Sequence, residues 1–455
     1  MYLRRRSLSG VDNVDAAAVA RVDKALEERF PTRMVPDLDR ITELLHLLGD
    51  PQRSYPSIHI TGTNGKTTTA RMIDALLRGF GVRTGRYTSP HLQRVTERIA
   101  LDGTPVSAPR FVEVYDELAP FVTIVDERHP DRVTFFELLT AMAFAAFADA
   151  PVDIAVVEVG LGGRWDATNV LHAPVTVATS IGLDHVGILG PTIADIAAEK
   201  AGIVHEGALL VTAAQTEAAA RVLLERVASV GARVAREGVE FGVRSRSVAV
   251  GGQSLDLAGL GGDYDDVFLP LYGAHQAGNA SCALAAVEGF FGAEERGPLD
   301  IEVVRAAFAD VSSPGRLEIV RRSPTVLLDG AHNPAGAAAL AAAVEESFAF
   351  ERLVGVLAVL DDKDAAGLLE ALEPVLTEVV VTRNSSPRAL AAEALGEVAR
   401  DVFGDDRVSV LDRFDDALER AVALAEADAG VGGGVLVTGS IVTVGDARTL
   451  LGGAA

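Results

Sequence analysis

The chain has 455 residues, a formal net charge of −23 at pH 7 and 49% hydrophobic residues. This length exceeds one ordinary hydrophobic core, which predicts two domains, and the acidic balance argues against DNA, RNA or a membrane surface as a partner. The single cysteine, Cys282, excludes a disulfide within the chain and, with no signal-peptide or membrane-span pattern, favours a cytoplasmic protein.

Apolar strand patterns alternate with alanine-rich helical patterns along the first half of the chain. The predicted strands are Ser57–Ile60, Val82–Arg86, Ile154–Val159, Val175–Ser180 and Leu209–Thr212. The predicted helices are Thr67–Phe80, Glu137–Ala148, Ile193–Ala201 and Glu217–Val230. This alternation predicts an α/β domain with a mainly parallel sheet.

A different pattern then separates the two halves. The glycine-rich segment Gly242–Gly273 favours short antiparallel strands, and a long helix is predicted at Asn279–Phe291. Two turn clusters follow, at Gly297–Pro298 and at Ser312–Gly315, and either one can mark a domain boundary. We place the boundary at the second cluster, which gives an N-terminal domain of residues 1–312 and a C-terminal domain of residues 313–455.

A second alternating series begins after this boundary. Its predicted strands are Thr325–Asp329, Leu353–Val359, Glu378–Thr382, Val408–Leu411 and Gly434–Thr438. Its predicted helices are Ala335–Phe348, Ala365–Leu372, Ala389–Val402 and Phe414–Ala427. The series predicts a smaller, Rossmann-like doubly wound α/β domain, although no G-x-G-x-x-G fingerprint follows its first strand.

The stretch "TGTNGKTTT" at residues 61–69 follows the first predicted strand and opens a helix. Such a turn presents backbone N–H groups and the positive end of a helix dipole to an anion. Lys66 adds a charge for the β and γ phosphates, and Thr67 or Thr68 offers a hydroxyl to Mg²⁺. The alternative is a capped helix after a glycine turn. We predict nucleotide contacts from Gly62, Thr63, Asn64, Gly65, Lys66, Thr67 and Thr68.

This short phosphate loop resembles that of the Mur ligase superfamily, and further motifs occur in the family's order. They are "YTSPHL" (87–92), "TFFELLT" (134–140), "VVEVGLGGRWDATNV" (156–170), "SIGLDHVGILG" (180–190) and "EKAGIV" (199–204). The ordered set is similar to the folylpolyglutamate synthases, which are often bifunctional as dihydrofolate synthases. The resemblance extends to "VTGSI" near the C-terminus.

The resemblance implies a metal site and a modified lysine. It makes Ser89, Glu158 and His185 Mg²⁺ ligands at two positions, and Lys200 a lysine carbamylated by CO₂. A carboxylate such as Glu158, at the end of an apolar strand, needs a partner in any case, and Mg²⁺ prefers oxygen ligands. The alternatives are an ion pair for Glu158, a turn hydroxyl at Ser89, a loop histidine at His185 and a solvated lysine at position 200.

The resemblance also implies the substrate contacts. Pterin contacts are expected from two segments: Thr134, Phe135, Phe136 and Glu137 in the first, and Trp165, Asp166 and Ala167 in the second. The alternative for the aromatic residues is core packing, and the alternative for Asp166 is a capped turn. ATP contacts are expected from Asn279, Arg316 and Asp329. Glutamate contacts are expected from His332 and Ser440. The alternative here is helix capping, by Asn333 before Pro334 and by Ser440 before "IVTVGDA".

The sequence therefore predicts an ATP-dependent ligase with Lys66, His185 and Lys200 in catalytic roles. A folate carboxylate would be activated as an acyl phosphate and then coupled to L-glutamate, with ATP and Mg²⁺ as cofactors and a monomer as the working unit. Two alternatives remain: a cell-wall Mur ligase acting on a UDP-muramoyl substrate, and a nucleotide-binding protein without catalysis. Only about sixty residues precede the phosphate loop, which is short for the extra domain of the cell-wall enzymes.

Overall fold

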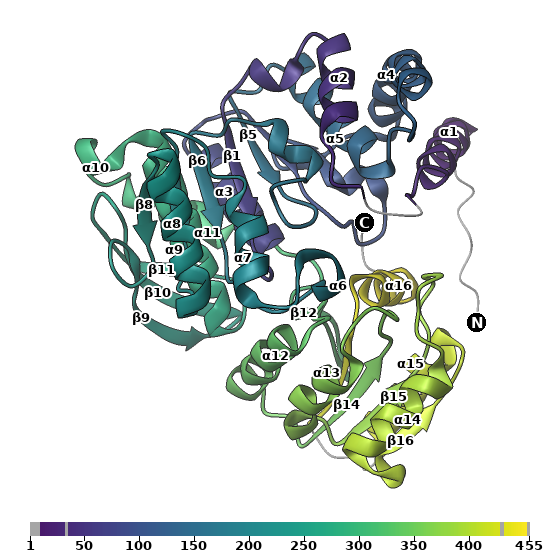
Figure 1. The fold of residues 1–455 in the computed structure, drawn as a ribbon. Coiled ribbons are helices and arrows are strands. Elements are labelled where there is room, and N and C mark those ends of the chain that lie inside the picture. Colours follow the sequence, from purple (N-terminus) through teal and green to yellow (C-terminus); the bar gives the residue numbers. More distant parts are fainter. Residues whose placement is uncertain (1–9, 32–34, 428–431, 453–455) are drawn as a thin grey trace.

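The structure is a computed structural model that describes residues 10–31, 35–427 and 432–452 (Figure 1). Its largest sheet has eight strands in the order β4-β3-β2-β5-β1-β6-β7-β8. These strands are β1 (Ser57–Thr61), β2 (Thr84–Tyr87), β3 (Ile99–Leu101), β4 (Thr104–Pro105), β5 (Ile154–Glu158), β6 (Val175–Ala178), β7 (Leu209–Thr212) and β8 (Arg233–Arg236). All neighbours pair in parallel except β2–β3 and β3–β4, which confirms the predicted mainly parallel sheet.

Helices cover both faces of this sheet, so its central strands are buried on both sides. On one face, Val156 packs in a cluster with α3 (Lys66–Gly79), α9 (Ala274–Phe291) and α11 (Ile301–Ala309). On the other face, Val157 packs with α2, α4 and α5. The bounds of the remaining helices of this half are α1 (Gly10–Glu27), α2 (Asp39–Leu47), α4 (Ala108–Arg128), α5 (Phe135–Asp149), α6 (Val186–Leu189), α7 (Ile193–Ala201), α8 (Glu217–Val230) and α10 (Ala293–Arg296).

The glycine-rich segment forms the predicted antiparallel strands. These are β9 (Gly242–Ala249), β10 (Gly252–Ala258) and β11 (Asp263–Leu269), in the order β11-β10-β9. The helix after them begins at Ala274, earlier than the predicted Asn279. Gly273 turns the chain at φ 93°, and the polar residues His275 and Gln276 are already part of the helix.

The second half forms a six-stranded sheet in the order β12-β13-β17-β14-β15-β16. Its strands are β12 (Glu318–Arg322), β13 (Thr325–Leu328), β14 (Arg352–Leu357), β15 (Glu378–Val381), β16 (Val408–Val410) and β17 (Gly433–Thr438). Its helices are α12 (Pro334–Ser347), α13 (Ala365–Leu372), α14 (Ala392–Phe403), α15 (Phe414–Glu426) and α16 (Ile441–Leu451). The antiparallel strand β12 was not predicted, and α16 is the helix that Ser440 was considered to cap. Helix α14 begins at Ala392 and not at Ala389, because Ala389 pairs with Leu360 in a β-bridge.

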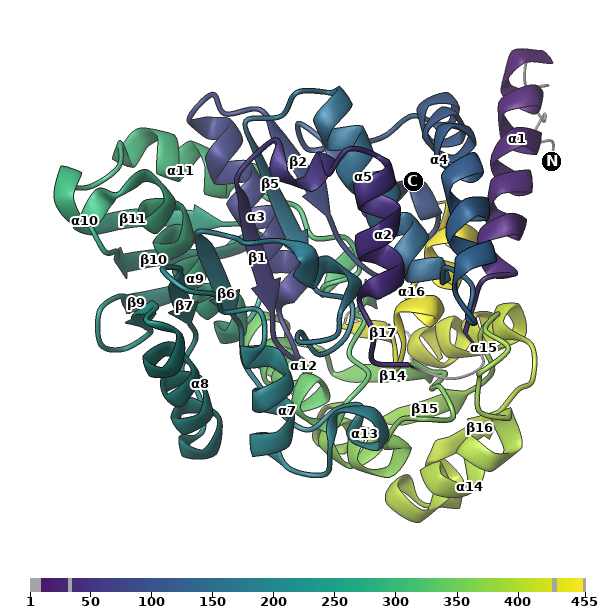
Figure 2. The ribbon, with the colours of Figure 1, turned by 45° about the horizontal axis from the view of Figure 1, so that its top comes forward.

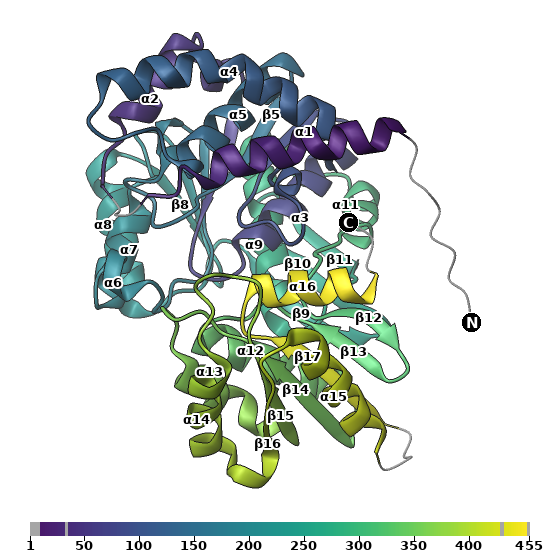
Figure 3. The same ribbon diagram turned by 90° about the vertical axis from the view of Figure 1, so that its right-hand side faces the viewer.

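The two halves face each other across the carboxyl end of the large sheet. Figure 2 shows β1 ending towards α12, and Figure 3 shows α16 running along the boundary between the halves. Side chains cross this boundary, since the amide of Asn64 bonds to Asn333 at 3.2 Å and the hydroxyl of Thr68 lies 3.0 Å from that of Ser313. Within the described ranges no helix has the length and apolar character needed to cross a membrane.

Candidate active site

The phosphate loop connects β1 to α3 and needs its two glycines for packing as well as for backbone conformation. Gly62 and Gly65 have φ angles of 145° and 89°. A Cβ on Gly62 would lie 1.8 Å from the hydroxyl oxygen of Thr179, and one on Gly65 would lie 2.4 Å from Oδ1 of Asn279. The loop is therefore held tightly between β6 and α9, with its backbone N–H groups at the start of α3.

Lys66 is the first residue of α3, and its side chain folds back onto the preceding loop. Its ammonium group donates to the carbonyl oxygens of Gly62 at 3.1 Å and Thr63 at 3.2 Å. Burial lowers the pKa of Lys66, with Glu158 and Asp184 opposing that shift. Within the part of the chain that the structure describes, the amine has carbonyl partners but no carboxylate within ion-pair distance, so its positive charge is available to a phosphate group.

Glu158 ends β5 with its side chain buried beside the start of α3. The hydroxyl of Thr67 donates to both carboxylate oxygens at 2.9 Å, and the amide of Ser89 donates to one of them at 3.1 Å. Burial raises the pKa of Glu158, and nearby Lys66 opposes this. The structure thus distinguishes the two threonines, since Thr67 faces Glu158 whereas Thr68 faces Ser313.

The oxygen atoms of Glu158, Thr67 and Ser89 suit Mg²⁺, which prefers oxygen ligands and commonly shares them with phosphate and water. The described residues contain no group of three or more His, Cys, Asp or Glu side chains that could hold a metal ion by themselves. A magnesium ion here would therefore be held by few protein ligands together with the nucleotide, which fits the donor set present.

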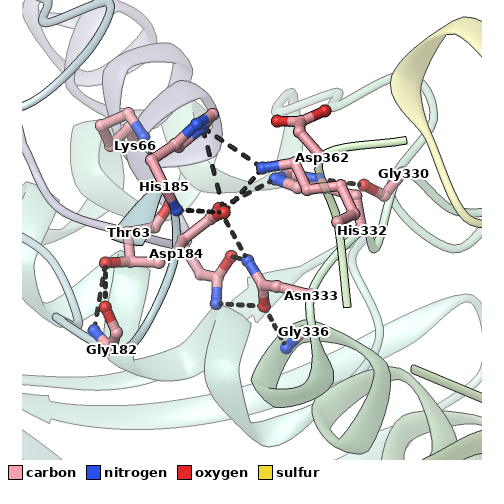
Figure 4. A network of polar contacts seen from close by, with 12 residues as sticks. Thr63, Lys66, Gly182, Asp184, His185, Gly330, His332, Asn333, Gly336 and Asp362 are labelled. Carbon is pink, nitrogen blue, oxygen red and sulfur yellow. Dashed lines mark hydrogen bonds and ion pairs between the residues drawn. The ribbon is translucent and has the colours of Figure 1, made fainter. Parts of the chain in front are cut away.

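Asp184 and His185 follow β6 and meet residues of the second half. Asp184 lies between His185, His332 and Asn333 (Figure 4). The ammonium group of Lys363 donates to Asp184 at 2.6 Å and lies 3.3 Å from Nε2 of His185. Burial would raise the pKa of Asp184, but the bonds from His332 and Lys363 hold it well below its usual range.

His185 is a neutral imidazole in this arrangement, because burial lowers its pKa to about 4. A histidine that binds a metal ion must also be neutral, which agrees with the predicted role of His185. In this structure, however, the ammonium of Lys363 faces the Nε2 lone pair that a metal would need. The assignment of His185 to Mg²⁺ stays a prediction.

Lys200 lies near the end of α7 and is buried, with 4% of its surface exposed. Its amine donates to the carbonyl oxygen of Gly62 at 2.8 Å. Burial and the charge of Lys66 lower the pKa of Lys200 to about 7, so the neutral amine that reacts with CO₂ is abundant near neutral pH. The alternative of a solvated surface lysine does not fit this burial.

The predicted residues of the second half carry structural contacts as well. Asp329 accepts hydrogen bonds from the amides of Leu317 and Ala331, both at 2.8 Å. Asn333 caps α12 through the amide of Gly336, and Ser440 caps α16 through the amide of Val442. The capping roles expected for Asn333 and Ser440 are confirmed, and they leave further acceptor capacity for a ligand.

One cavity of about 480 Å³ joins these elements. The predicted residues that line it are Gly62, Thr63, Asn64, Gly65, Lys66, Thr67, Thr68, Ser89, Glu158, His185, Lys200, Asn279, Arg316, Asp329 and His332. Its wall does not include the remaining predicted residues, which are Thr134, Phe135, Phe136, Glu137, Trp165, Asp166, Ala167 and Ser440. The structure thus brings the predicted nucleotide and metal residues together and leaves the predicted pterin residues outside this cavity.

The segment Thr134–Glu137 begins α5 and is occupied with structural contacts. Thr134 and Glu137 form a reciprocal capping box, and Glu137 pairs with Arg40 at 3.0 Å. Phe30 stacks on the Phe135 ring with centroids 4.4 Å apart, and Arg98 lies over the same ring at 5.2 Å. These contacts favour the alternative that was left open from the sequence, while the pterin contact stays a prediction.

The aromatic ring of Phe136 packs against the loop after β5. A Cβ on Gly160 would lie 2.4 Å from the ring, so glycine is required for this approach. In the same loop Trp165 exposes 49% of its surface, whereas Asp166 is buried. Asp166 caps the short helical turn Ala167–Val170 through the amide of Thr168, which confirms the capping role considered from the sequence.

Sequence reasoning missed Lys363, Thr179 and Glu237. Lys363 lies in "DDKDA" after β14, where a lysine among carboxylates at the end of a parallel strand was an available signal. Glu237 lines the cavity after β8 and accepts a hydrogen bond from the amide of Ala214 at 2.9 Å. Nothing in the sequence distinguished Thr179, which acts through the packing of Gly62.

A phosphate loop in one α/β domain, opposed by a second α/β domain across a shared cavity, defines a two-domain nucleotide-dependent enzyme of the Mur ligase type. Two family models match accordingly: the Mur ligase middle domain over residues 60–287, and the Mur ligase glutamate ligase domain over residues 315–441. The chain belongs to the Mur ligase family and, within it, to the folylpolyglutamate synthase and dihydrofolate synthase group.

Matches to two relatives support the narrower group. The chain is 53% identical to the dihydrofolate synthase/folylpolyglutamate synthase of Mycobacterium tuberculosis, with 96% of this chain and 95% of that protein aligned. The structure of M. tuberculosis folylpolyglutamate synthase complexed with ADP matches with a TM-score of 0.93 and 53% identity, over 97% and 99% of the two chains. E. coli FolC in complex with DHPP and ADP matches with a TM-score of 0.83 and 31% identity, over 96% and 98%.

Proposed function

We propose that this chain is an ATP-dependent ligase that adds L-glutamate to the carboxylate of a folate or a dihydropteroate. The observation that carries the proposal is the meeting of Lys66 and Glu158 with Arg316 and His332 in one cavity. Cationic groups from both domains thus surround the place where a triphosphate and a carboxylate would react. The family membership and the ADP-bound relatives support the same reading.

The first step transfers the γ-phosphoryl group of ATP to the substrate carboxylate. A carboxylate oxygen forms a bond to the γ-phosphorus, the bond from that phosphorus to the β–γ bridging oxygen breaks, and ADP leaves. Lys66 and the loop amides orient the phosphates, and Arg316 offsets the negative charge that spreads over the transferred group. Glu158, Thr67 and Ser89 would hold Mg²⁺, which supplies further charge neutralisation at the phosphates.

The second step forms the amide. The uncharged amine of glutamate bonds to the acyl carbon, the acyl carbon–oxygen bond breaks, phosphate leaves, and the nitrogen releases its proton. His332 would contact glutamate; this role is supported by its position in the cavity lining and by the carbonyl oxygen of Gly330, which lies 2.8 Å from Nδ1 and orients the ring. Closure of the two domains, which touch through Asn64 and Asn333, would keep water from the acyl phosphate.

We also propose that Lys200 is carbamylated. Its neutral amine adds to CO₂ and loses a proton, which turns a buried cation into an anion near Lys66. The supporting observations are its burial and its pKa of about 7. NMR with ¹³C-bicarbonate should show a carbamate signal that is absent from Lys200→Met; an identical spectrum for both proteins would contradict the modification.

Product analysis by mass spectrometry tests the main proposal. With ATP and L-glutamate, dihydropteroate or tetrahydrofolate should gain one or more glutamyl residues with matching release of ADP. A muramoyl nucleotide and an amino acid should give no product, and product only from that pair would establish the cell-wall alternative. ATP binding with no product from either pair would establish the non-catalytic alternative.

A second Mg²⁺ position stays a prediction. So do the monomeric state, the cytoplasmic location and the absence of nucleic-acid and membrane partners. The two domains, with a boundary between residues 312 and 313, are proposed because the eight-stranded and six-stranded sheets are separate and because the family matches leave a gap between residues 287 and 315.

A further inference from the structure

The loop of residues 88–94, which follows β2 in the first domain, places a leucine against the second domain. Leu92 is half-buried and packs at the edge of a hydrophobic cluster whose other members all belong to the second domain. A Cβ on Gly445 of α16 would lie 2.1 Å from the carbonyl oxygen of Leu92, and a Cβ on Gly315 would lie 3.1 Å from its Cδ2. The two glycines thus form a seat for Leu92, and a larger residue at position 445 would displace it.

Polar contacts surround this seat. Nε2 of Gln93 donates to the hydroxyl of Thr449 at 3.3 Å, and Nε of Arg448 donates to Oε1 of Gln93 at 3.2 Å. Arg448 also pairs with Glu318, whose carboxylate accepts the amide of Gly315 at 2.8 Å. Figure 3 shows α16, which carries Arg448 and Thr449, along the boundary between the halves. The seat and the partners of Gln93 are therefore one connected surface of the second domain.

Within the first domain, hydrogen bonds connect the same loop to the candidate metal site. The carboxylate of Glu97 accepts the backbone amides of Leu92 at 2.9 Å and Gln93 at 3.0 Å. At the start of the loop, the amide of Ser89 donates to the carboxylate of Glu158 at 3.1 Å. Satisfied networks of this kind make a segment rigid, so the place of Leu92 determines the place of Ser89.

In the second domain, the backbone connects the seat to Arg316. Gly315 directly precedes Arg316, and its carbonyl oxygen accepts the amide of Gly330 at 2.9 Å. Arg316 and Gly330 both line the cavity, and a Cβ on Gly330 would lie 3.0 Å from Nη1 of Arg316. The seat that receives Leu92 is therefore part of the same short segment as a guanidinium group at the cavity wall.

The two domains also touch at other places. Tyr272 lies beside Phe348 with ring centroids 5.0 Å apart, and the side chains of Asn64 and Asn333 exchange hydrogen bonds. Neither contact includes a residue of the loop 88–94. The seat of Leu92 is therefore the contact by which this loop is positioned against the second domain.

We infer that Leu92 is a positioning residue that sets the arrangement of the two domains around the cavity. Its seat in the second domain holds Ser89, and through Ser89 the carboxylate of Glu158, at a fixed place relative to Arg316. The inference rests on the proposed function, because that function gives Glu158 and Arg316 a joint task at the transferred phosphoryl group. Such a task is sensitive to position, since a displacement of about 1 Å can cost about a hundredfold in rate.

Turnover should report the loss of this seat. Leu92→Ala should lower kcat for ADP release by about tenfold or more, whereas Leu92→Met, which keeps an apolar side chain of similar volume, should stay within about threefold of wild type. The matched control is Val95→Ala, because Val95 is buried in the next turn of the chain but packs in a cluster of the first domain. This control should lower the melting temperature with kcat within about twofold of wild type. Equal losses of kcat in Leu92→Ala and Val95→Ala, or no loss in Leu92→Ala, would overturn the inference.

Gly445→Ala tests the seat from the second domain. The new Cβ would meet the carbonyl oxygen of Leu92 and force the loop away, while alanine favours the helical conformation of α16 more than glycine does. The variant should therefore lose about tenfold in kcat although its helix is intact. Combined with Leu92→Ala, it should lose less than the product of the two single effects, because both changes displace the same loop. Effects that simply multiply would contradict a shared seat.

A distance measurement is independent of turnover. Because the single cysteine, Cys282, is buried, spin labels can be attached through Glu117→Cys on α4 and Glu397→Cys on α14, two exposed positions in different domains. Pulsed electron paramagnetic resonance should show a distance distribution that shifts or broadens with Leu92→Ala and does not change with Val95→Ala. The same distribution with and without Leu92→Ala would overturn the inference. If the wild-type protein transferred no glutamate, the proposed function would fail, while this distribution would still decide whether Leu92 sets the domain arrangement.

Discussion

Ionisable side chains in two regions of the first domain, the phosphate loop and the start of α5, have different kinds of partners. At the phosphate loop, the buried Lys200 and Glu158 and the half-buried Lys66 have only carbonyl, hydroxyl or amide partners among the described residues, and desolvation shifts the pKa of each in the direction that favours its neutral form. At the start of α5, Glu137 is paired with Arg40 and completes a helix cap. Ionisable side chains without a partner of opposite charge lower the stability of the fold and are available to a ligand. Ionisable side chains that have such a partner stabilise the fold.

The largest effect is expected for Lys66→Met, which removes the ammonium group from the phosphate loop. The variant should lose about a thousandfold or more in kcat, because one preorganised charge at the transferred phosphoryl group supplies several kcal/mol. Glutamate-dependent ADP release measures it, and an unchanged melting temperature shows that the fold is intact. Turnover close to wild type would remove Lys66 from the mechanism.

A loss of about a hundredfold is expected for Glu158→Gln. The amide keeps the size of the carboxylate and can still meet Thr67 and Ser89, but its charge for Mg²⁺ is gone. The concentration of Mg²⁺ that gives half-maximal activity should therefore rise along with the loss of kcat. If activity fell with the Mg²⁺ dependence unchanged, Glu158 would have a role other than holding the ion.

Lys200→Met should reduce kcat by a somewhat smaller factor and should make the protein more stable. Between its folded pKa of about 7 and the ordinary value of 10.5, the unfolded chain holds a proton that the folded chain has released, so stability rises with pH across this window. Below about pH 7 the full cost of charging the buried amine remains. Methionine removes that cost.

Denaturant unfolding at several pH values, in buffers kept free of CO₂ so that Lys200 carries its unmodified amine, checks this sign. The wild-type and Lys200→Met curves should differ most near pH 7 and approach each other as the pH rises towards 10. A matched comparison with a surface lysine change, such as Lys24→Met, should show no such pH-dependent difference. A variant that is less stable than wild type at pH 7 would contradict the picture of a strained, functional lysine.

The same contrast explains which parts of the site were predictable from the sequence. Residues 61–69 combine glycines, a lysine and threonines directly after a strand, and local chemistry alone indicates a phosphate site. Glu158 was identifiable because a carboxylate ends an apolar strand. Both signals are local, and the structure places both in the cavity.

Other features depend on contacts between distant segments, which no local pattern reports. Lys363 reaches Asp184 from 179 positions away in the sequence, and His59 contacts Thr168 from 109 positions away. Strand β12 was missed because "EIVRR" has only two aliphatic residues beside three charged ones, and it lies at an edge, where the sheet needs no continuous apolar run. Two-domain α/β architecture was predictable because periodicity repeats along the whole chain.

The smallest effect on activity, and the sharpest test of the contrast, is expected for Glu137→Gln. The amide oxygen can still accept the amide of Thr134 and preserve the cap, so the change isolates the charge that faces Arg40. Breaking a buried pair costs about 3 to 5 kcal/mol when one charge is left behind, and Asp37, which also bonds Arg40 at 3.2 Å, reduces that cost here. The melting temperature should fall while KM for the folate stays within about twofold of wild type, because the free energy lost is that of folding. A large rise in that KM with unchanged stability would instead place Glu137 at the substrate and return the start of α5 to the functional side of the comparison.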